Sequence, residues 1–274
     1  MKGEAAPRSE NRYSRIIERI FLSKYVVGDR EVAFVRRHIE DTARDLGIEL
    51  PKNLGDVIYS FRYRTALPSS VSERAPQGES WLIQPAGRAR YKFVAATVTS
   101  IIPNRLLPET KVPDSTPGVI AVYAMSDEQA LLARVRYNRL IDIFTGVACY
   151  SLQNHLRTSI AGIGQVETDE IYIGIDRRGV HYVFPVQAKG GNDLLSVVQI
   201  GQDIAMCAAK FPTLLSRPIA PQFIGPDLIV LFSFGLDNGR VVQLDERHYR
   251  LVPPEEITPG DLQSYRLQPV PEQN

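Results

Sequence analysis

The sequence predicts an α/β protein in which a mixed β-sheet is flanked by helices, with a helical module before it. Between residues 126 and 234 the chain reads as a helix, a β-hairpin, a second helix and a fully apolar strand, which is the alternation of an α/β core. The first 64 residues instead contain three helical patterns. A chain of 274 residues is long enough to hold both parts.

The composition is that of a globular protein, with 44% hydrophobic and 23% charged residues. No run approaches the roughly 18 apolar residues that span a bilayer. Residues 1–15, MKGEAAPRSENRYSR, lack the apolar core of a secretory signal. Cys149 and Cys207 have no metal-ligand spacing, which indicates reduced thiols. We therefore expect a cytoplasmic protein with no membrane partner.

The charges are unevenly distributed, although the formal net charge is only +1. Residues 1–110 contain 18 Lys and Arg against 13 Asp and Glu, so the remainder of the 32 and 31 contains 14 against 18. A basic first part offers phosphate contacts, and an acidic remainder offers a site for a divalent cation. Imbalances of this size also arise by chance, so charge alone leaves both interpretations open.

The N-terminal module begins with helices predicted at residues 14–25, 29–47 and 53–64. Asp29 is expected to cap the second helix, and Gly47 to end it in a left-handed conformation.

A hairpin is predicted over residues 80–98, with its turn at Pro85–Gly87. Three helices followed by a hairpin is the order of a winged-helix module. Basic residues end the third helix and continue on the hairpin, namely Arg62, Arg64, Arg88, Arg90 and Lys92. If they converge, they form a DNA phosphate-binding patch. The alternative is that they are ordinary surface charges.

The elements of the second part follow from periodicity and from turn residues. Residues 103–125 contain four prolines and predict an extended connection. A long helix is expected from Ser126 to about Gly146, and the segment after it either continues this helix or forms another. The remaining predictions are a hairpin at 165–189, a helix at 193–212, strands at 227–234 and 240–252, and a peripheral tail at 253–274.

Polar side chains gather at one end of the 165–189 hairpin. Strand alternation places Gln187 and Lys189 on one face, and Glu167 and Asp169 on one face of the partner strand. A turn centred on residues 177 and 178 sets residues 166–168 opposite 187–189, although the register depends on details of the turn. Carboxylate and amide oxygens suit Mg²⁺, and a lysine can orient water or phosphate. The predicted chemistry is metal-assisted phosphodiester hydrolysis. The alternative is a solvated strand end.

The stretch TDEIYIGIDRRGVHYVFPVQAK resembles the catalytic hairpin of the PD-(D/E)XK nuclease superfamily, and FPVQAKGG is similar to the Gln-containing version of Mrr-type restriction nucleases. On this resemblance Asp169 is the first acid, with Thr168 at the position of the proline. Gln187 is the second metal-side residue and Lys189 the lysine. Glu167 is an additional acid with no fixed equivalent, and Glu170 is an alternative to Asp169.

Further residues come from the same resemblance. A glutamate on the preceding helix assists in many members, which points to Glu128 or Asp142. The helix after the motif also resembles that of relatives, so Gln199, Gln202 or Asp203 is expected to project toward the site. His155 is interpreted as a structural residue at a helix end or core edge, with a role at the site as the alternative.

The resemblance implies a restriction-endonuclease-like fold and a Mg²⁺-dependent DNA endonuclease of the restriction type, in which Mn²⁺ is able to replace Mg²⁺. The expected organisation is a winged-helix-like DNA-binding module at 1–110, a catalytic domain at 111–252 and the tail. The expected partners are double-stranded DNA and a second copy in a homodimer. Two alternatives stay open: a repair or junction-resolving nuclease, and an inert DNA-binding protein. The latter arises because Gln187 stands where an acid is commoner.

Overall fold

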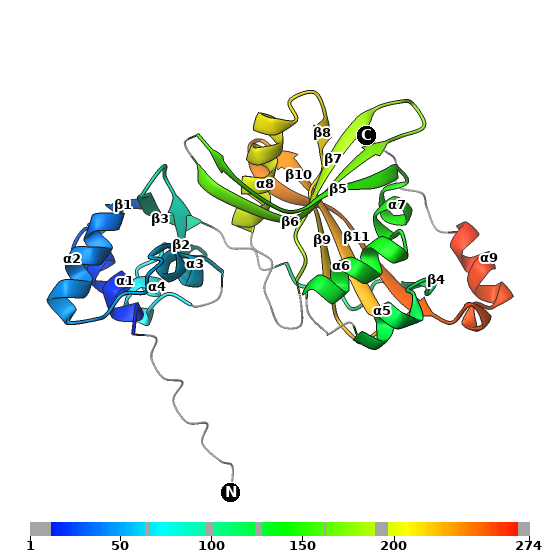
Figure 1. The fold of residues 1–274 in the computed structure, drawn as a ribbon, viewed down its shortest axis with the longest axis horizontal. Coiled ribbons are helices and arrows are strands. Elements are labelled where there is room, and N and C mark those ends of the chain that lie inside the picture. The colour runs from blue at the N-terminus through cyan, green and yellow to red at the C-terminus, as the bar shows by residue number, and fades with distance from the viewer. Residues whose placement is uncertain are drawn as a thin grey trace, which may run out of the picture. The chain divides into compact units, whose positions relative to one another are not determined.

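The computed structural model describes residues 12–63, 66–96, 101–123, 128–161, 163–189 and 197–267 (Figure 1). Within a helix, the side chains of residues 56, 59, 62 and 63 also lie outside the described part. The chain forms two compact units: the first comprises residues 1–99 and 159–165, and the second residues 100–158 and 166–274.

The first unit combines four helices with a three-stranded antiparallel sheet. Its elements are α1 (Ser14–Leu22), β1 (Glu31–Val35), α2 (Arg36–Leu46), α3 (Gly55–Tyr63), α4 (Ser69–Ser72), β2 (Ser80–Pro85) and β3 (Arg90–Ala96). The strand order is β1-β3-β2. An aromatic core joins the layers, since Phe21 packs edge-on against Trp81 and Phe93 with ring centroids 5.0 Å away in both cases.

The helix predicted over 29–47 is wrong in its first part, which forms strand β1. Val32 and Phe34 alternate with exposed residues and face the core, as a half-buried strand requires. The strand pairs with β3, so tertiary pairing overrides the helical spacing. Helix α2 then begins at Arg36 and ends at Gly47, which is left-handed at φ 63° as expected.

Asp29 does not cap the second helix as predicted, because α2 begins at Arg36 and Asp29 Oδ2 instead accepts a hydrogen bond from the Val26 amide at 2.9 Å. The predicted first and third helices and the hairpin are confirmed. Helices occur at α1 and α3, and Asn53 Oδ1 accepts a hydrogen bond from the Gly55 amide at 3.1 Å before α3. The predicted hairpin is the β2–β3 pair.

The second unit contains an 8-stranded mixed sheet with the order β4-β11-β10-β9-β7-β6-β5, in which β8 pairs with β7. The strands are β4 (Glu109–Pro113), β5 (Ala148–Ile160), β6 (Gly164–Ile175), β7 (His181–Val186), β8 (Leu215–Ser216), β9 (Ile219–Phe223), β10 (Leu228–Asp237) and β11 (Arg240–Val252). β9 runs parallel to β7, and β4 runs parallel to β11. β6 is antiparallel to β7, and β10 is antiparallel to both β9 and β11.

Helices cover both faces of this sheet. On one face α6 (Glu128–Tyr137) and α7 (Leu140–Thr145) bury apolar side chains against even-numbered residues of β7 such as Phe184. On the other face α8 (Val197–Lys210) places Ile200 against Val230 and Phe232 of β10 (Figure 1). The predicted α/β class, with a mixed sheet flanked by helices, is therefore confirmed.

Three local predictions in this unit are wrong. The long helix from residue 126 is broken, since Arg139 is left-handed at φ 50° between α6 and α7. The segment 148–160 is not helical but forms β5, which pairs with β6. The proline-containing segment is extended in strand β4, but its later part forms the short helix α5 (Gly118–Tyr123), so it is not extended throughout.

The hairpin, the helix after it and the strands near residues 227–234 and 240–252 occur as predicted, at β6–β7, α8, β10 and β11. Within the described residues, no helix is long and apolar enough to cross a membrane.

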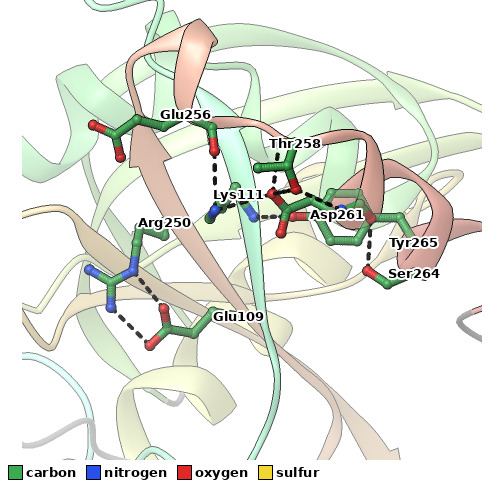
Figure 2. Close-up of polar contacts among 8 residues, drawn as sticks. All are labelled: Glu109, Lys111, Arg250, Glu256, Thr258, Asp261, Ser264 and Tyr265. Atoms are coloured by element: carbon green, nitrogen blue, oxygen red, sulfur yellow. Dashed lines mark hydrogen bonds and ion pairs between the residues drawn. The ribbon is translucent and has the colours of Figure 1, made fainter.

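The C-terminal segment is attached by polar contacts to strand β4 at the end of the sheet (Figure 2). It contains a 3₁₀ turn (Pro254–Glu256) and α9 (Pro259–Leu267), and no residue of α9 up to Leu267 is buried. The Lys111 amide donates to Tyr265 Oη at 2.9 Å, and Lys111 Nζ lies 3.1 Å from both the Glu256 carbonyl and Asp261 Oδ2. The segment thus covers part of an edge strand, where unpaired backbone groups otherwise invite association.

Candidate functional site

The site residues predicted from the motif lie where β6 and β7 part. The regular ladder runs from Ile175↔His181 to Glu170↔Val186. Beyond it the chain follows β9 instead, since the amides of Gln187 and Lys189 donate to Ile219 and Pro221 carbonyls at 3.0 Å. The amide of Ala188 donates at 2.8 Å to Asp169 Oδ2. The Asp169 carboxylate therefore occupies the position that the next backbone carbonyl would take.

Asp169 is half-buried, and its environment raises the pKa of its carboxyl group. Burial is the largest cause, and the negative charge of Glu128 adds to it. The Ala188 hydrogen bond and the positive charges of Lys189 and His155 act in the opposite direction. A cation bound by this carboxylate would favour its ionised form.

Gln187 is buried and forms a polar network with α8. Its Nε2 donates to the Glu167 carbonyl at 2.9 Å and to Asp203 Oδ2 at 3.0 Å. Thr168 Oγ1 donates to the other oxygen of Asp203. Asp203 has no exposed surface, and this burial raises the pKa of its carboxyl to about 7. Both hydrogens of the Gln187 amide are thereby engaged, so Oε1 remains as the atom that can bind a cation.

Lys189 directs its charge toward α6. Its Nζ lies 3.6 Å from Glu128 Oε1, in the first turn of that helix, and its side chain is only 13% exposed. Gln187 thus contacts α8 and Lys189 contacts α6, whereas regular strand alternation predicts that both lie on one face. The alternation does not apply here because β7 ends at Val186, before either residue.

His155 approaches the same region from β5. Its Nε2 lies 3.3 Å from Nε2 of Gln129, the neighbour of Glu128, and its backbone is left-handed at φ 48°. Such strain in a non-glycine residue often accompanies functional sites.

The remaining candidate acids have other partners. Glu167 is bound by Arg157 Nη2 at 3.1 and 2.9 Å through its two carboxylate oxygens. Glu170 is fully buried and accepts two hydrogen bonds from Arg136, at 3.1 and 2.9 Å, and one from Ser151. These contacts leave Asp169 as the acid best placed to bind a ligand.

Asp142 accepts a hydrogen bond from the Cys149 amide at 2.9 Å at the start of β5, whereas Glu128 contacts Lys189 directly. Among the α8 residues named from the resemblance, Asp203 contacts the motif through Gln187.

Neither the Arg157–Glu167 pair nor the Arg136–Glu170 pair could be predicted from the sequence. The Arg157–Glu167 pair requires β5 to lie beside β6, and the Arg136–Glu170 pair requires α6 to lie close to β6. An interpretation of residues 148–160 as a strand would have revealed Arg157, since a hairpin brings it opposite the acid-rich segment.

The basic residues predicted to contact DNA are only partly described. Arg88 and Arg90 are exposed at the turn between β2 and β3, and Lys92 Nζ pairs with Glu31 at 2.6 Å. The Arg62 side chain and all of Arg64 lie outside the described residues.

Comparisons with protein-family models, curated proteins and solved structures each gave no match for this chain.

The donor set fits one kind of cation. Among the residues that the structure describes, no three His, Cys, Asp or Glu side chains are grouped so that they could hold a metal ion. Mg²⁺ is commonly bound by one or two carboxylates together with water and substrate phosphate, and the Asp169 carboxylate and the free Gln187 oxygen suit that mode.

Proposed function

We propose that the protein is a Mg²⁺-dependent DNA endonuclease of the restriction type, with a PD-(D/E)XK-like site. The observation that carries the proposal is that Asp169, Gln187 and Lys189 all lie where β6 and β7 part: Asp169 accepts a hydrogen bond from the Ala188 amide, between the other two residues, and Lys189 lies 3.6 Å from Glu128. The order of elements also supports it, because an acid-bearing strand, a strand leading into Gln-x-Lys and a helix follow one another as in that superfamily.

Each residue has a role that its contacts suit. Asp169 and the Oε1 of Gln187 would hold Mg²⁺, which would stabilise the negative charge that develops on the phosphate during hydrolysis. Lys189 would orient the attacking water or hold the phosphate. Glu128 would keep the Lys189 ammonium in place. The Lys189 side chain is only 13% exposed, so its charge is partly shielded from bulk water. Electrostatic interactions are stronger in such an environment than in bulk water.

The first unit is proposed to read DNA as a winged-helix-like module. It has helices followed by the β2–β3 hairpin, with β1 pairing beside them. Arg88 and Arg90 at the tip of the hairpin would contact phosphates, which fix position on DNA without reading its sequence.

Cleavage assays with two DNA substrates test the type of nuclease. A restriction enzyme should cut duplex plasmid at defined sites in the presence of Mg²⁺. A repair or junction-resolving enzyme should prefer a four-way junction and show little sequence preference. Equal resistance of both substrates at all metal concentrations would contradict the nuclease proposal.

An inert DNA-binding protein is the second candidate, and the sparse acids at the site favour it. Calorimetric titration with Mn²⁺ distinguishes the two candidates, since an inert protein should show no Mn²⁺ binding that is lost when Asp169 is substituted.

A further inference from the structure

Asp203 is a buried carboxylate that the proposed hydrolysis does not use directly. It lies on α8 with no exposed surface, so it cannot contact DNA or solvent. Its two oxygens accept hydrogen bonds from different strands, one from Thr168 of β6 and one from Gln187 beyond β7. Burying a carboxylate costs free energy unless hydrogen bonds compensate, so such a group usually has a specific role.

The contacts of Gln187 fix the orientation of its side-chain amide. Nε2 is held between two acceptors, the Glu167 carbonyl and the Asp203 carboxylate. A reversed amide would place Oε1 against the Glu167 carbonyl and the ionised Asp203 carboxylate, neither of which can donate a hydrogen bond. The Asp203 carboxylate and the Glu167 carbonyl therefore together select one of two amide orientations that have the same shape.

The charge of Asp203 also bears on the motif. Gln187 is neutral, at a position where the resemblance leads one to expect an acid. A hydrogen bond to a carboxylate is stronger than one between neutral groups and polarises the amide, which increases the negative character of Oε1.

We propose that Asp203 is a positioning residue that fixes the Gln187 amide so that its Oε1 is presented to the metal. This role rests on the proposed function, because it concerns the same metal site. Partners behind a metal ligand orient it and increase its basicity, and their loss typically reduces metal affinity about 10- to 100-fold.

Substitutions at position 203 distinguish an effect on the orientation of the Gln187 amide from a general effect on the fold. Asp203→Ala removes the acceptor, and we expect Mn²⁺ affinity, measured by calorimetry, to fall at least about 10-fold. Asp203→Asn keeps an oxygen for Gln187 while its amide donates to Thr168, so affinity should stay much closer to that of the wild type. Asp176→Asn is a matched control, since Asp176 is a buried, hydrogen-bonded carboxylate at the opposite end of the same hairpin.

A second background excludes a general structural effect. Glu at position 187 has two equivalent oxygens and needs no amide orientation, and it would repel Asp203. In a Gln187→Glu protein, Asp203→Ala should therefore leave Mn²⁺ affinity unchanged or increase it. A loss of the same size in both backgrounds would show that Asp203 acts only on the fold, which would overturn the proposal.

The side-chain amide of Gln187 gives a readout that needs no metal. Its two NMR resonances, assigned by their loss in Gln187→Glu, should exchange slowly with solvent in the wild type and rapidly in Asp203→Ala. Wild-type Mn²⁺ binding with equal affinity in Asp203→Ala would overturn the positioning role while the proposed function stands. A wild type that binds no Mn²⁺ would overturn the proposed function, and the positioning role with it.

Discussion

Lys189 Nζ lies 3.6 Å from Glu128 Oε1, which links the segment after β7 to the first turn of α6. The Lys189 side chain is mostly buried, whereas that of Glu128 is 40% exposed. The Glu128 carboxylate thus lies beside the ammonium group at the rim of the site, and its removal should loosen Lys189 without disturbing the core.

Glu128→Gln should lower the cleavage rate by about 5- to 10-fold, because an ion pair of this exposure contributes on the order of 1 kcal/mol, which corresponds to that factor in rate. Single-turnover cleavage of plasmid DNA measures the effect. Glu255→Gln, an exposed glutamate of the C-terminal segment, serves as the control and should cut at the wild-type rate. A rate for Glu128→Gln equal to that of the control would remove Glu128 from the site.

Asp169→Asn should abolish measurable Mn²⁺ binding in calorimetry, because the substitution removes the charged oxygen ligand while it keeps the shape of the side chain. Asp237→Asn, at the exposed end of β10, provides the comparison. Binding that persists in Asp169→Asn and disappears in a Glu167 or Glu170 variant would move the ligand role to that residue.

The hairpin of the first unit should contribute to DNA affinity through charge. Arg88→Ala combined with Arg90→Ala should weaken binding to duplexes of any sequence, and should reduce the slope of log affinity against log salt by about 2, one for each lost phosphate contact. Fluorescence anisotropy across a salt series measures both. Arg44→Ala, which removes an exposed arginine already paired with Asp41, is the control. An unchanged slope in the double variant would show that this turn does not contact DNA.

The attachment of α9 should depend on pH through Asp261. Hydrogen bonds from Thr258 and Lys111 lower the pKa of its carboxyl to about 2. A lowered pKa stabilises the folded form above the ordinary value of 3.8, and this stabilisation disappears as the pH falls through about 2. Hydrogen exchange of the α9 backbone amides should therefore become faster, relative to that of the amides in the β-sheet, as the pH falls from 4 to 2.

Asp261→Asn should make the α9 amides exchange faster already at neutral pH. In this variant the relative exchange rate of α9 should no longer change between pH 4 and pH 2. An α9 whose exchange is the same in the variant and the wild type at neutral pH would show that other contacts, such as Lys111 with Tyr265, suffice to hold it.

The β6–β7 hairpin could be predicted because its local signals agree. Apolar β-formers on both strands and a polar turn favour the β6–β7 pair, and the fully apolar β10 is also evident from the sequence. The register was less certain: Ile171 pairs with Pro185, one position away from the predicted alignment. A turn of slightly different geometry is enough for this shift.

The elements that were missed depend on pairing rather than on pattern. β5 is largely exposed and carries polar residues, so its strand character comes from its hydrogen bonds with β6. β1 is five residues long and precedes a true helix. Val32, Val35 and Ile39 have helical spacing, whereas the alternation of Val32 and Phe34 is that of the strand. The contact between Gln187 and Asp203 could not be derived from spacing, because it requires knowing where β6 and β7 part.

Cleavage of plasmid DNA by purified protein, with and without Mg²⁺ and beside the Lys189→Ala variant, tests the central claim most directly. The proposal predicts linear products with defined ends for the wild type in Mg²⁺, none in chelator, and a rate at least about 100-fold lower for Lys189→Ala. Lys210→Ala, an exposed lysine at the end of α8, should cut normally. Intact plasmid with the wild type in Mg²⁺, or cutting by Lys189→Ala at the wild-type rate, would contradict the proposed site.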